Sequence, residues 1–262
     1  MTILIQTRPS NGARVLRDAI RAEGINCRIR RRSAVSRLRA SSMLINWGCS
    51  SGTQPPHLNN YDAVEASVDK RDAFEVMGLA GVRLPLFTVG RTISASSTND
   101  TDNIWLKRTL TQGHGGRGIE VVRPGEEWGE PAPLYVQYVP KLQEFRVHVF
   151  AVDDDPRCLS RQKLGVNGFG RDRNQQLIRN TDNGWVLGLV RDSQAAFKAE
   201  EEAVKAVYAL GLDFAAVDVI IGRDDGLAYV LEANTAPGIE AEPVVDFYKT
   251  NFIRYYRSGQ WS

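Results

Sequence analysis

Short apolar runs near the N-terminus predict a small unit that mixes strands with one helix. The helix has an apolar face at helical spacing and ends before Gly24, a common helix stop. The runs before and after it are too short for helices and favour strands. The pattern stops at Pro55-Pro56, so we expect a small α/β lobe over residues 1–65. The predicted helix covers residues 11–23, and the predicted strands cover residues 2–6, 27–30 and 43–47.

Residues 66–262 show a different pattern, in which strand pairs are separated by three predicted helices. These helices cover Asp69–Ala80, the stretch from Asp192 or Ser193 to about Leu210, and the chain after Pro243. The polar stretch 94–103 predicts a loop. Residues 153–185 mix Asp, Arg, Asn and Gly with apolar runs and predict a long β-excursion that acts as a lid. We expect an α+β domain here.

The segment from Asp218 to Gly238 predicts a β-hairpin with an Arg-Asp-Asp-Gly turn. Glu232 and Asn234 are two residues apart, so both side chains leave the same face of an extended strand. Pairing Gly222 with Ala228 places Asp218 opposite Glu232. Two carboxylates and an amide oxygen would then converge in a site suited to Mg²⁺. A solvated hairpin would carry the same residues, so the segment alone leaves both interpretations open.

An upstream strand ends in Lys107 and leads into a glycine-rich loop, and a second strand follows at Ile119–Val122. The loop satisfies the G-x-G-x-x-G pattern, but a dinucleotide site needs a helix after the glycines. A glycine loop between two strands can instead cover a triphosphate with its backbone N–H groups, with Lys107 as a point charge. A hairpin tip without function is the alternative. The glycines are Gly113, Gly115, Gly116 and Gly118.

A third strand-like region alternates strictly from Glu144 to Phe150 and follows the run Leu134–Val139. One face carries Phe145, Val147 and Val149, and the other carries Glu144, Arg146 and His148. Ionisable side chains on one face indicate a strand that lines a cleft. An exposed sheet face would show the same alternation.

The order of these features resembles the ATP-grasp superfamily of carboxylate–amine ligases. The segment Leu231–Gly238 is similar to the metal-binding strand of D-alanine–D-alanine ligases and of ribosomal-protein glutamate ligases, and the resemblance covers roughly residues 66–245. It implies an ATP-grasp fold, with antiparallel sheets and helices, preceded by the small α/β lobe. It also implies a nucleotide lobe at about 83–140 and a metal lobe at about 141–262.

The resemblance implies a role for each matched residue. Lys107 would bind the α- and β-phosphates of ATP, under the loop formed by Gly113, Gly115, Gly116 and Gly118. Gln137, Tyr138 and Val139 would hold adenine, and Glu144 would bind the ribose hydroxyls. Mg²⁺, with Mn²⁺ as the alternative, would be held by Asp218, Glu232 and Asn234. The γ-phosphate or the reacting carboxylate would be met by Arg146, Arg161 and Lys163. Gln137 stands where many relatives carry a glutamate, which leaves ATP versus GTP open.

The implied reaction joins a carboxylate to an amine through an acyl phosphate. Such a site works by positioning and charge neutralisation and needs no nucleophilic side chain. We expect an amino acid or an acidic peptide or protein as substrate. A kinase on the same scaffold and an ATP-binding module without turnover remain alternatives, and a homo-oligomer is left open.

Composition narrows the class of protein. In 262 residues, 42% are hydrophobic and 24% are charged, as in ordinary globular proteins. The run Ile3–Ile5 is too short for a signal peptide or a membrane span, and three scattered cysteines fit reduced thiols, so we expect a cytoplasmic protein. The three histidines lack the spacing of zinc ligands.

The net charge of +2 hides an asymmetry between the two parts of the chain. Residues 1–123 hold 18 Lys and Arg against 10 Asp and Glu, and every basic residue before Lys70 is an arginine. Three interpretations compete: a solvated basic surface, a docking patch for an acidic substrate, and a nucleic-acid site. The segment has little aromatic interleaving, so nucleic acid ranks last.

Overall fold

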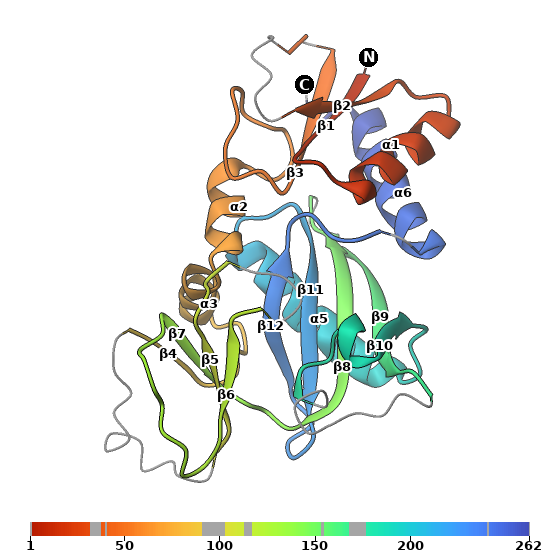
Figure 1. Cartoon of the computed structure of the whole chain (residues 1–262). Helices are drawn as coiled ribbons and strands as arrows, with labels where there is room; N and C mark the ends of the chain where they lie inside the picture. Colours follow the sequence, from red (N-terminus) through yellow and green to blue (C-terminus); the bar gives the residue numbers. More distant parts are fainter. Residues whose placement is uncertain are drawn as a thin grey trace.

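The computed structural model describes residues 2–31, 38–39, 41–90, 103–112, 117–152, 155–167, 177–239 and 241–261. Three sheets organise this part of the chain (Figure 1). A parallel sheet forms the N-terminal lobe, and two antiparallel sheets form the rest. No helix in the described ranges is both long enough and apolar enough to cross a membrane.

The N-terminal sheet has the order β2-β1-β3 and is covered by two helices from opposite ends of the chain. Its strands are β1 (Thr2–Thr7), β2 (Cys27–Arg31) and β3 (Ser42–Trp47), and the helices are α1 (Asn11–Ala22) and α6 (Glu242–Ser258). Ser10 caps α1 by accepting a hydrogen bond from the Ala13 N–H at 3.2 Å. In Figure 1 the red α1 and the blue α6 lie side by side. The apolar core of this lobe therefore includes Tyr248 and Phe252 of α6.

Two helices connect this lobe to the four-stranded sheet, where the sequence predicted one. These are α2 (Tyr61–Val68) and α3 (Lys70–Leu79). Asp69 has an extended backbone and accepts hydrogen bonds from the N–H groups of Arg71 and Asp72, so it ends α2 and caps α3. The four-stranded sheet has the order β4-β7-β5-β6. Its strands are β4 (Phe87–Val89), β5 (Trp105–Arg108), β6 (Ile119–Val122) and β7 (Leu134–Gln137).

The five-stranded sheet has the order β10-β9-β8-β11-β12 and carries helix α5 (Ser193–Ala209) on one face. Its strands are β8 (Lys141–Phe150), β9 (Arg157–Gly165), β10 (Trp185–Gly188), β11 (Phe214–Gly222) and β12 (Ala228–Asn234). Phe145, Val147 and Val149 pack toward α5, as their alternation predicted. The opposite face of the sheet therefore presents the polar side chains of β8 and β11.

The predicted β-excursion is present in part. Strands β9 and β10 pair antiparallel, with the short 3₁₀ helix η1 (Thr181–Asn183) before β10. Residues 168–176 of this segment, and most of the predicted loop 94–103, lie outside the described residues.

Candidate active site

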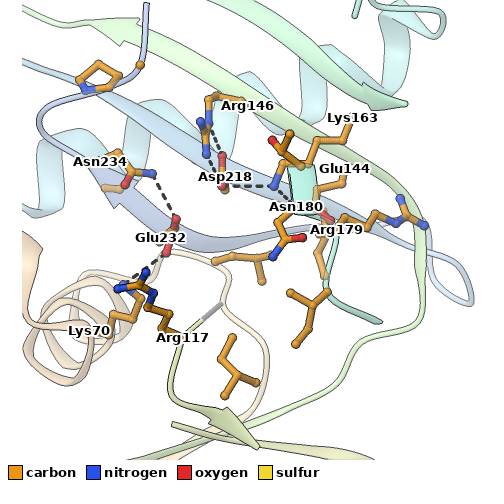
Figure 2. A pocket seen from close by; sticks show the side chains of 18 of the residues that line it. Lys70, Arg117, Glu144, Arg146, Lys163, Arg179, Asn180, Asp218, Glu232 and Asn234 are labelled. Carbon is orange, nitrogen blue, oxygen red and sulfur yellow. Dashed lines mark hydrogen bonds and ion pairs between the residues drawn. The ribbon is translucent and has the colours of Figure 1, made fainter. Parts of the chain in front are cut away.

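A cleft of about 1010 Å³ lies between the two antiparallel sheets and is bordered by the N-terminal lobe (Figure 2). The N-terminal lobe contributes Thr7–Ser10 and Trp47-Gly48, and the loop after β12 contributes Thr235–Gly238. Nine residues predicted for the site line this cleft: Gln137, Tyr138, Val139, Glu144, Arg146, Lys163, Asp218, Glu232 and Asn234. Residues more than ninety positions apart in the chain are thus brought to one cavity.

The hairpin of β11 and β12 pairs Asp218 with Glu232, as the sequence predicted. The supporting alignment was wrong by one residue, because Ile221 rather than Gly222 lies opposite Ala228. A β-bulge between Asp218 and Val219 absorbs the difference. The Asn234 amide donates a hydrogen bond from Nδ2 to Glu232 Oε1 at 3.2 Å. The three predicted metal ligands are therefore neighbours on two adjacent strands.

Asp218 is buried and held by two cations. Arg146, its partner on β8, donates from Nε to Oδ1 at 2.7 Å and from Nη2 to Oδ2 at 2.9 Å. Lys163 Nζ lies 3.4 Å from Oδ2. Burial raises the pKa of Asp218, but the charges of Arg146 and Lys163 outweigh burial and hold this pKa well below its usual range. The carboxylate is therefore ionised throughout the physiological pH range.

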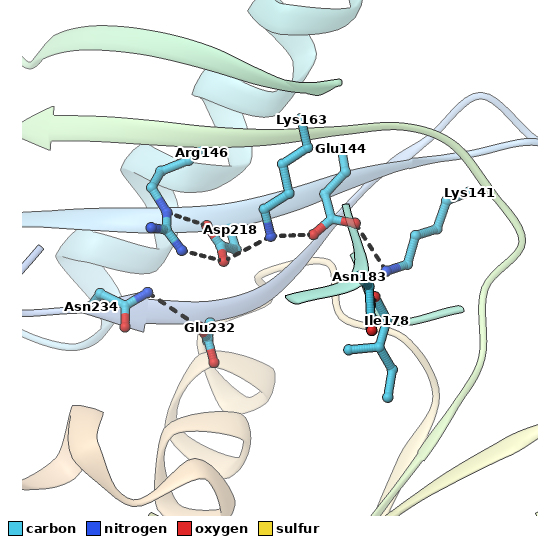
Figure 3. Close-up of polar contacts among 9 residues, drawn as sticks. All are labelled: Lys141, Glu144, Arg146, Lys163, Ile178, Asn183, Asp218, Glu232 and Asn234. Carbon is cyan, nitrogen blue, oxygen red and sulfur yellow. Dashed lines mark hydrogen bonds and ion pairs between the residues drawn. The ribbon is translucent and has the colours of Figure 1, made fainter. Parts of the chain in front are cut away.

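Lys163 links Asp218 to the second buried carboxylate, Glu144 (Figure 3). Its Nζ lies 2.6 Å from Glu144 Oε1, and Lys141 Nζ lies 2.9 Å from Oε2. Burial raises the pKa of Glu144, but the charges of the two lysines lower it by more than burial raises it. The net shift of this pKa is therefore downward. Burial lowers the pKa of Lys163, but Asp218 and Glu144 raise it by more. Both partners of Lys163 thus keep it charged.

Glu232 is the most accessible of these carboxylates and has its own cation. Lys70, at the start of α3, places Nζ 3.4 Å from Glu232 Oε2, and the sequence had given Lys70 no role (Figure 2). In the part of the chain that the structure describes, no group of three or more His, Cys, Asp or Glu side chains could hold a metal ion. Two carboxylates and one amide fit Mg²⁺, which needs few protein ligands and takes the rest from water and phosphate.

Two predicted site residues with described side chains do not line the cleft. Lys107 points to the outer face of the four-stranded sheet, where Nζ lies 2.8 Å from Glu120 Oε2. Its neighbour Arg108 lines the cleft in its place. Arg161 pairs with Arg146 across β8 and β9, and its Nη2 donates to the Leu187 carbonyl at 3.3 Å. Alternation along β5 separates Lys107 from Arg108, but it does not say which of them faces the cleft.

The glycine loop is described only at its end. Gly113, Gly115 and Gly116 lie outside the described residues. Gly118 has a φ of +72°, and a Cβ there would lie 2.8 Å from the Leu110 side chain. Its carbonyl accepts a hydrogen bond from the Thr109 N–H at 2.8 Å, which closes the β5–β6 hairpin. This turn by itself requires a glycine at position 118.

The chain before and along β10 adds cleft residues that the sequence did not single out. Arg179 donates from Nη2 to the Lys141 carbonyl at 3.3 Å, and its guanidinium lies 4.5 Å from the centre of the Trp185 ring. Burial raises the pKa of the nearby Tyr138 hydroxyl. An Arg and a Trp far from the predicted motifs gave no sequence signal, because only the fold brings this segment over β8.

No model of a protein family matches the sequence, and no curated protein matches it. Solved structures do match the fold. The D-alanine–D-alanine ligase from Bacillus anthracis is 14% identical with a TM-score of 0.64, over 98% of this chain and 99% of that one. The D-Ala:D-Ser ligase from Enterococcus faecalis is 14% identical with a TM-score of 0.66, over the same shares.

A third structure is similar to the same extent. It is a RiPP-associated ATP-grasp ligase from Chryseobacterium gregarium in complex with ADP and a leader and core peptide, 11% identical with a TM-score of 0.64, over 98% of this chain and 96% of that one. The α+β class and the antiparallel sheets predicted from the sequence are confirmed. The chain has the fold of the ATP-grasp ligases.

Proposed function

We propose that this protein is an ATP- and Mg²⁺-dependent ligase that joins a carboxylate to an amine through an acyl phosphate. The observation that supports this most is the paired Asp218 and Glu232, flanked by Arg146, Lys163 and Lys70, in the cleft of an ATP-grasp fold. This is a site for a polyphosphate and a cation, with basic groups placed to neutralise charge transferred between oxygens.

Each part of the cleft has a role in this proposal. Gln137, Tyr138 and Val139 hold the adenine base, and Glu144 accepts hydrogen bonds from the ribose. Asp218, Glu232 and Asn234 would hold Mg²⁺, or Mn²⁺ in its place, and the ion would neutralise part of the phosphate charge. The volume of about 1010 Å³ accommodates a nucleotide together with a second substrate.

The chemistry proceeds in two displacements. An oxygen of the substrate carboxylate attacks the γ-phosphorus, and the bond from that phosphorus to the β,γ-bridging oxygen breaks, which gives an acyl phosphate and ADP. The amine then attacks the acyl carbon, phosphate leaves, and the nitrogen loses a proton. Arg146 and Lys163 stabilise the negative charge on the transferred phosphoryl group, and the sheet fixes their positions. Arg161 does not line the cleft and has no role in this step.

His148 is excluded as a proton carrier by its surroundings. It is fully buried, and its Nδ1 lies 3.1 Å from the Tyr248 hydroxyl. Burial lowers its pKa to about 3, and the charge of Arg146 adds to this effect. The imidazole is therefore neutral at physiological pH and belongs to the core beneath the site.

The substrate in this proposal is an amino acid or an acidic peptide. The relatives act on D-alanine or were solved with a leader and core peptide, which supports this class. The exposed Arg28 and Arg31 on the edge strand β2 support an acidic docking partner. Arg30 is buried at 8% exposure, so it is unsuited to contact a partner directly.

The test is ADP release from MgATP against a panel of amino acids and acidic peptides, with Glu232→Gln as the inactive control. Release that requires both a carboxylate and an amine supports the ligase. A stable phosphorylated product without an amine would favour the kinase. ATP binding without release across the panel would favour a module without turnover.

A further inference from the structure

Strand β5 carries two consecutive basic residues, Lys107 and Arg108, whose side chains lie on opposite faces of the sheet. Leu106 and Arg108 line the cleft, together with Val136 of the neighbouring strand. Trp105 and Lys107 face outward and pair with residues of β6 on that side. Side chains alternate along a strand, so the two basic residues cannot both reach the cleft while the register holds.

Lys107 already has a complete set of neighbours on the outer face. Its side chain is 4% exposed and forms the ion pair with Glu120. The apolar cluster of Trp105, Tyr135 and Trp128 lies on the same face. A Cβ built at Gly129 would lie 3.8 Å from the Lys107 ammonium, so the Trp128-Gly129 segment approaches it closely.

Arg108 forms no such ion pair with any residue that the structure describes. Its Nε is buried and has no hydrogen-bond acceptor within the part of the chain that the structure describes. Burial lowers the pKa of Arg108, and the Glu232 carboxylate offsets only part of this effect. Glu232 forms its ion pair with Lys70 and accepts its hydrogen bond from Asn234. A half-buried arginine with a buried, unused Nε donor on the cleft wall is suited to bind an anion.

We propose that Arg108, and not Lys107, is the β5 residue that binds the phosphates of the nucleotide. This rests on the proposed nucleotide-binding function of the cleft. Arg108 is the last residue of β5, and it lines the same cleft as Glu232 and Lys70. A guanidinium can donate two parallel hydrogen bonds to phosphate oxygens, which an ammonium cannot do with the same geometry. The ligand class is therefore a nucleoside di- or triphosphate.

The chain offers a matched pair of variants, Arg108→Met and Lys107→Met, which remove adjacent charges on opposite faces of one strand. Binding of MgATP, MgADP and adenosine to the full-length protein is measured by titration calorimetry. We expect Arg108→Met to weaken MgATP binding by about 10- to 100-fold, as for loss of a hydrogen bond to a charged group. Lys107→Met leaves it within about twofold, because Lys107 does not line the cleft. Adenosine binding is the same in both variants, which separates a phosphate contact from general damage.

Arg108→Lys keeps the charge if the methionine variant fails to fold, and we expect it to bind MgATP more weakly than wild type with adenosine binding unchanged. Equal losses in the two methionine variants, a larger loss in Lys107→Met, or a loss that extends to adenosine would each overturn the proposal. A wild-type protein that binds no adenine nucleotide would overturn this inference and the nucleotide-binding part of the proposed function together. Nucleotide binding with the expected pattern but without ligation would leave the inference standing and count against the ligase alone.

Discussion

The two antiparallel sheets that face each other across the cleft differ in how they balance charge. The five-stranded sheet buries Glu144 and Asp218 and supplies their cations, Lys141, Lys163 and Arg146, from its own strands. The four-stranded sheet presents Leu106, Ile119 and Val136 to the cleft, with Arg108 among them. The carboxylates of the first surface are paired before any ligand binds, whereas Arg108 on the second surface has a buried Nε with no acceptor among the described residues.

The largest expected effect comes from breaking the balance at Asp218. Asp218→Asn leaves Arg146 and Lys163 without their shared counterion, and removing one partner of a buried pair costs about 3–5 kcal/mol. It also removes a proposed metal ligand, so we expect ADP release to fall by roughly 1000-fold, as for loss of a main electrostatic group. Urea unfolding and ADP release measure the two effects. Asp224→Asn, in the exposed hairpin turn, is the matched control, and an equal loss of stability there would contradict the argument.

The second prediction concerns Lys163, which forms ion pairs with both Glu144 and Asp218. Because the proposed metal ligand Asp218 is engaged by Lys163 and Arg146, we expect Mn²⁺ to bind at least about tenfold more tightly with an ATP analogue present than alone. Lys163→Met removes one of the two cations that hold Asp218, so it should strengthen nucleotide-free Mn²⁺ binding while weakening ATP binding. Electron paramagnetic resonance counts bound Mn²⁺ in each case. Wild-type Mn²⁺ affinity that is independent of nucleotide would refute this coupling.

A third prediction tests whether the five-stranded sheet accepts further positive charge next to Arg146. The folded protein holds His148 neutral with a pKa of about 3, whereas an unfolded histidine has a pKa of about 6.5. The stability that this provides is present above pH 6.5 and is lost as pH falls toward the folded pKa, by about 1.4 kcal/mol per pH unit. Urea unfolding from pH 7 to pH 5 should show this slope.

The control for that slope is His57, which is less buried and whose pKa is also lowered by burial. His148→Gln should remove most of the pH dependence, and His57→Gln should remove less of it. A slope that His148→Gln leaves intact would mean that other groups carry the pH dependence.

The smallest expected effect lies away from both sheets, on the arginines of β2. Arg28→Ala with Arg31→Ala should raise the KM for an acidic peptide by a few-fold and leave kcat unchanged, since exposed charges contribute about 1 kcal/mol or less. The effect should shrink with added salt. Arg14→Ala on the exposed side of α1 is the control, and an unchanged KM in the double variant would leave the solvated basic surface as the explanation.

Much of the fold was accessible from the sequence because its signals are local. Period-two alternation predicted which face of β8 carries Glu144 and Arg146, and Gly211 after α5 marked the end of that helix. The helix α2 was missed, since its short apolar pattern merges with that of α3 and only the extended backbone at Asp69 divides them. The pairing of Asp218 with Glu232 was predicted from the turn, although the bulge that sets it was not.

The sequence by itself determined the kinds of groups in the site: two strands with carboxylates, a basic strand end and a glycine loop, in a fixed order. Only the tertiary structure decided which charged side chains form ion pairs with each other and which of them face the cleft. It turned Arg108 into the cleft and Lys107 away from it, placed Lys163 between Glu144 and Asp218, and brought Lys70 to Glu232. The physical reason is that alternation fixes relative faces along one strand, whereas the choice of face and the partners of a buried charge depend on how the sheets pack against each other.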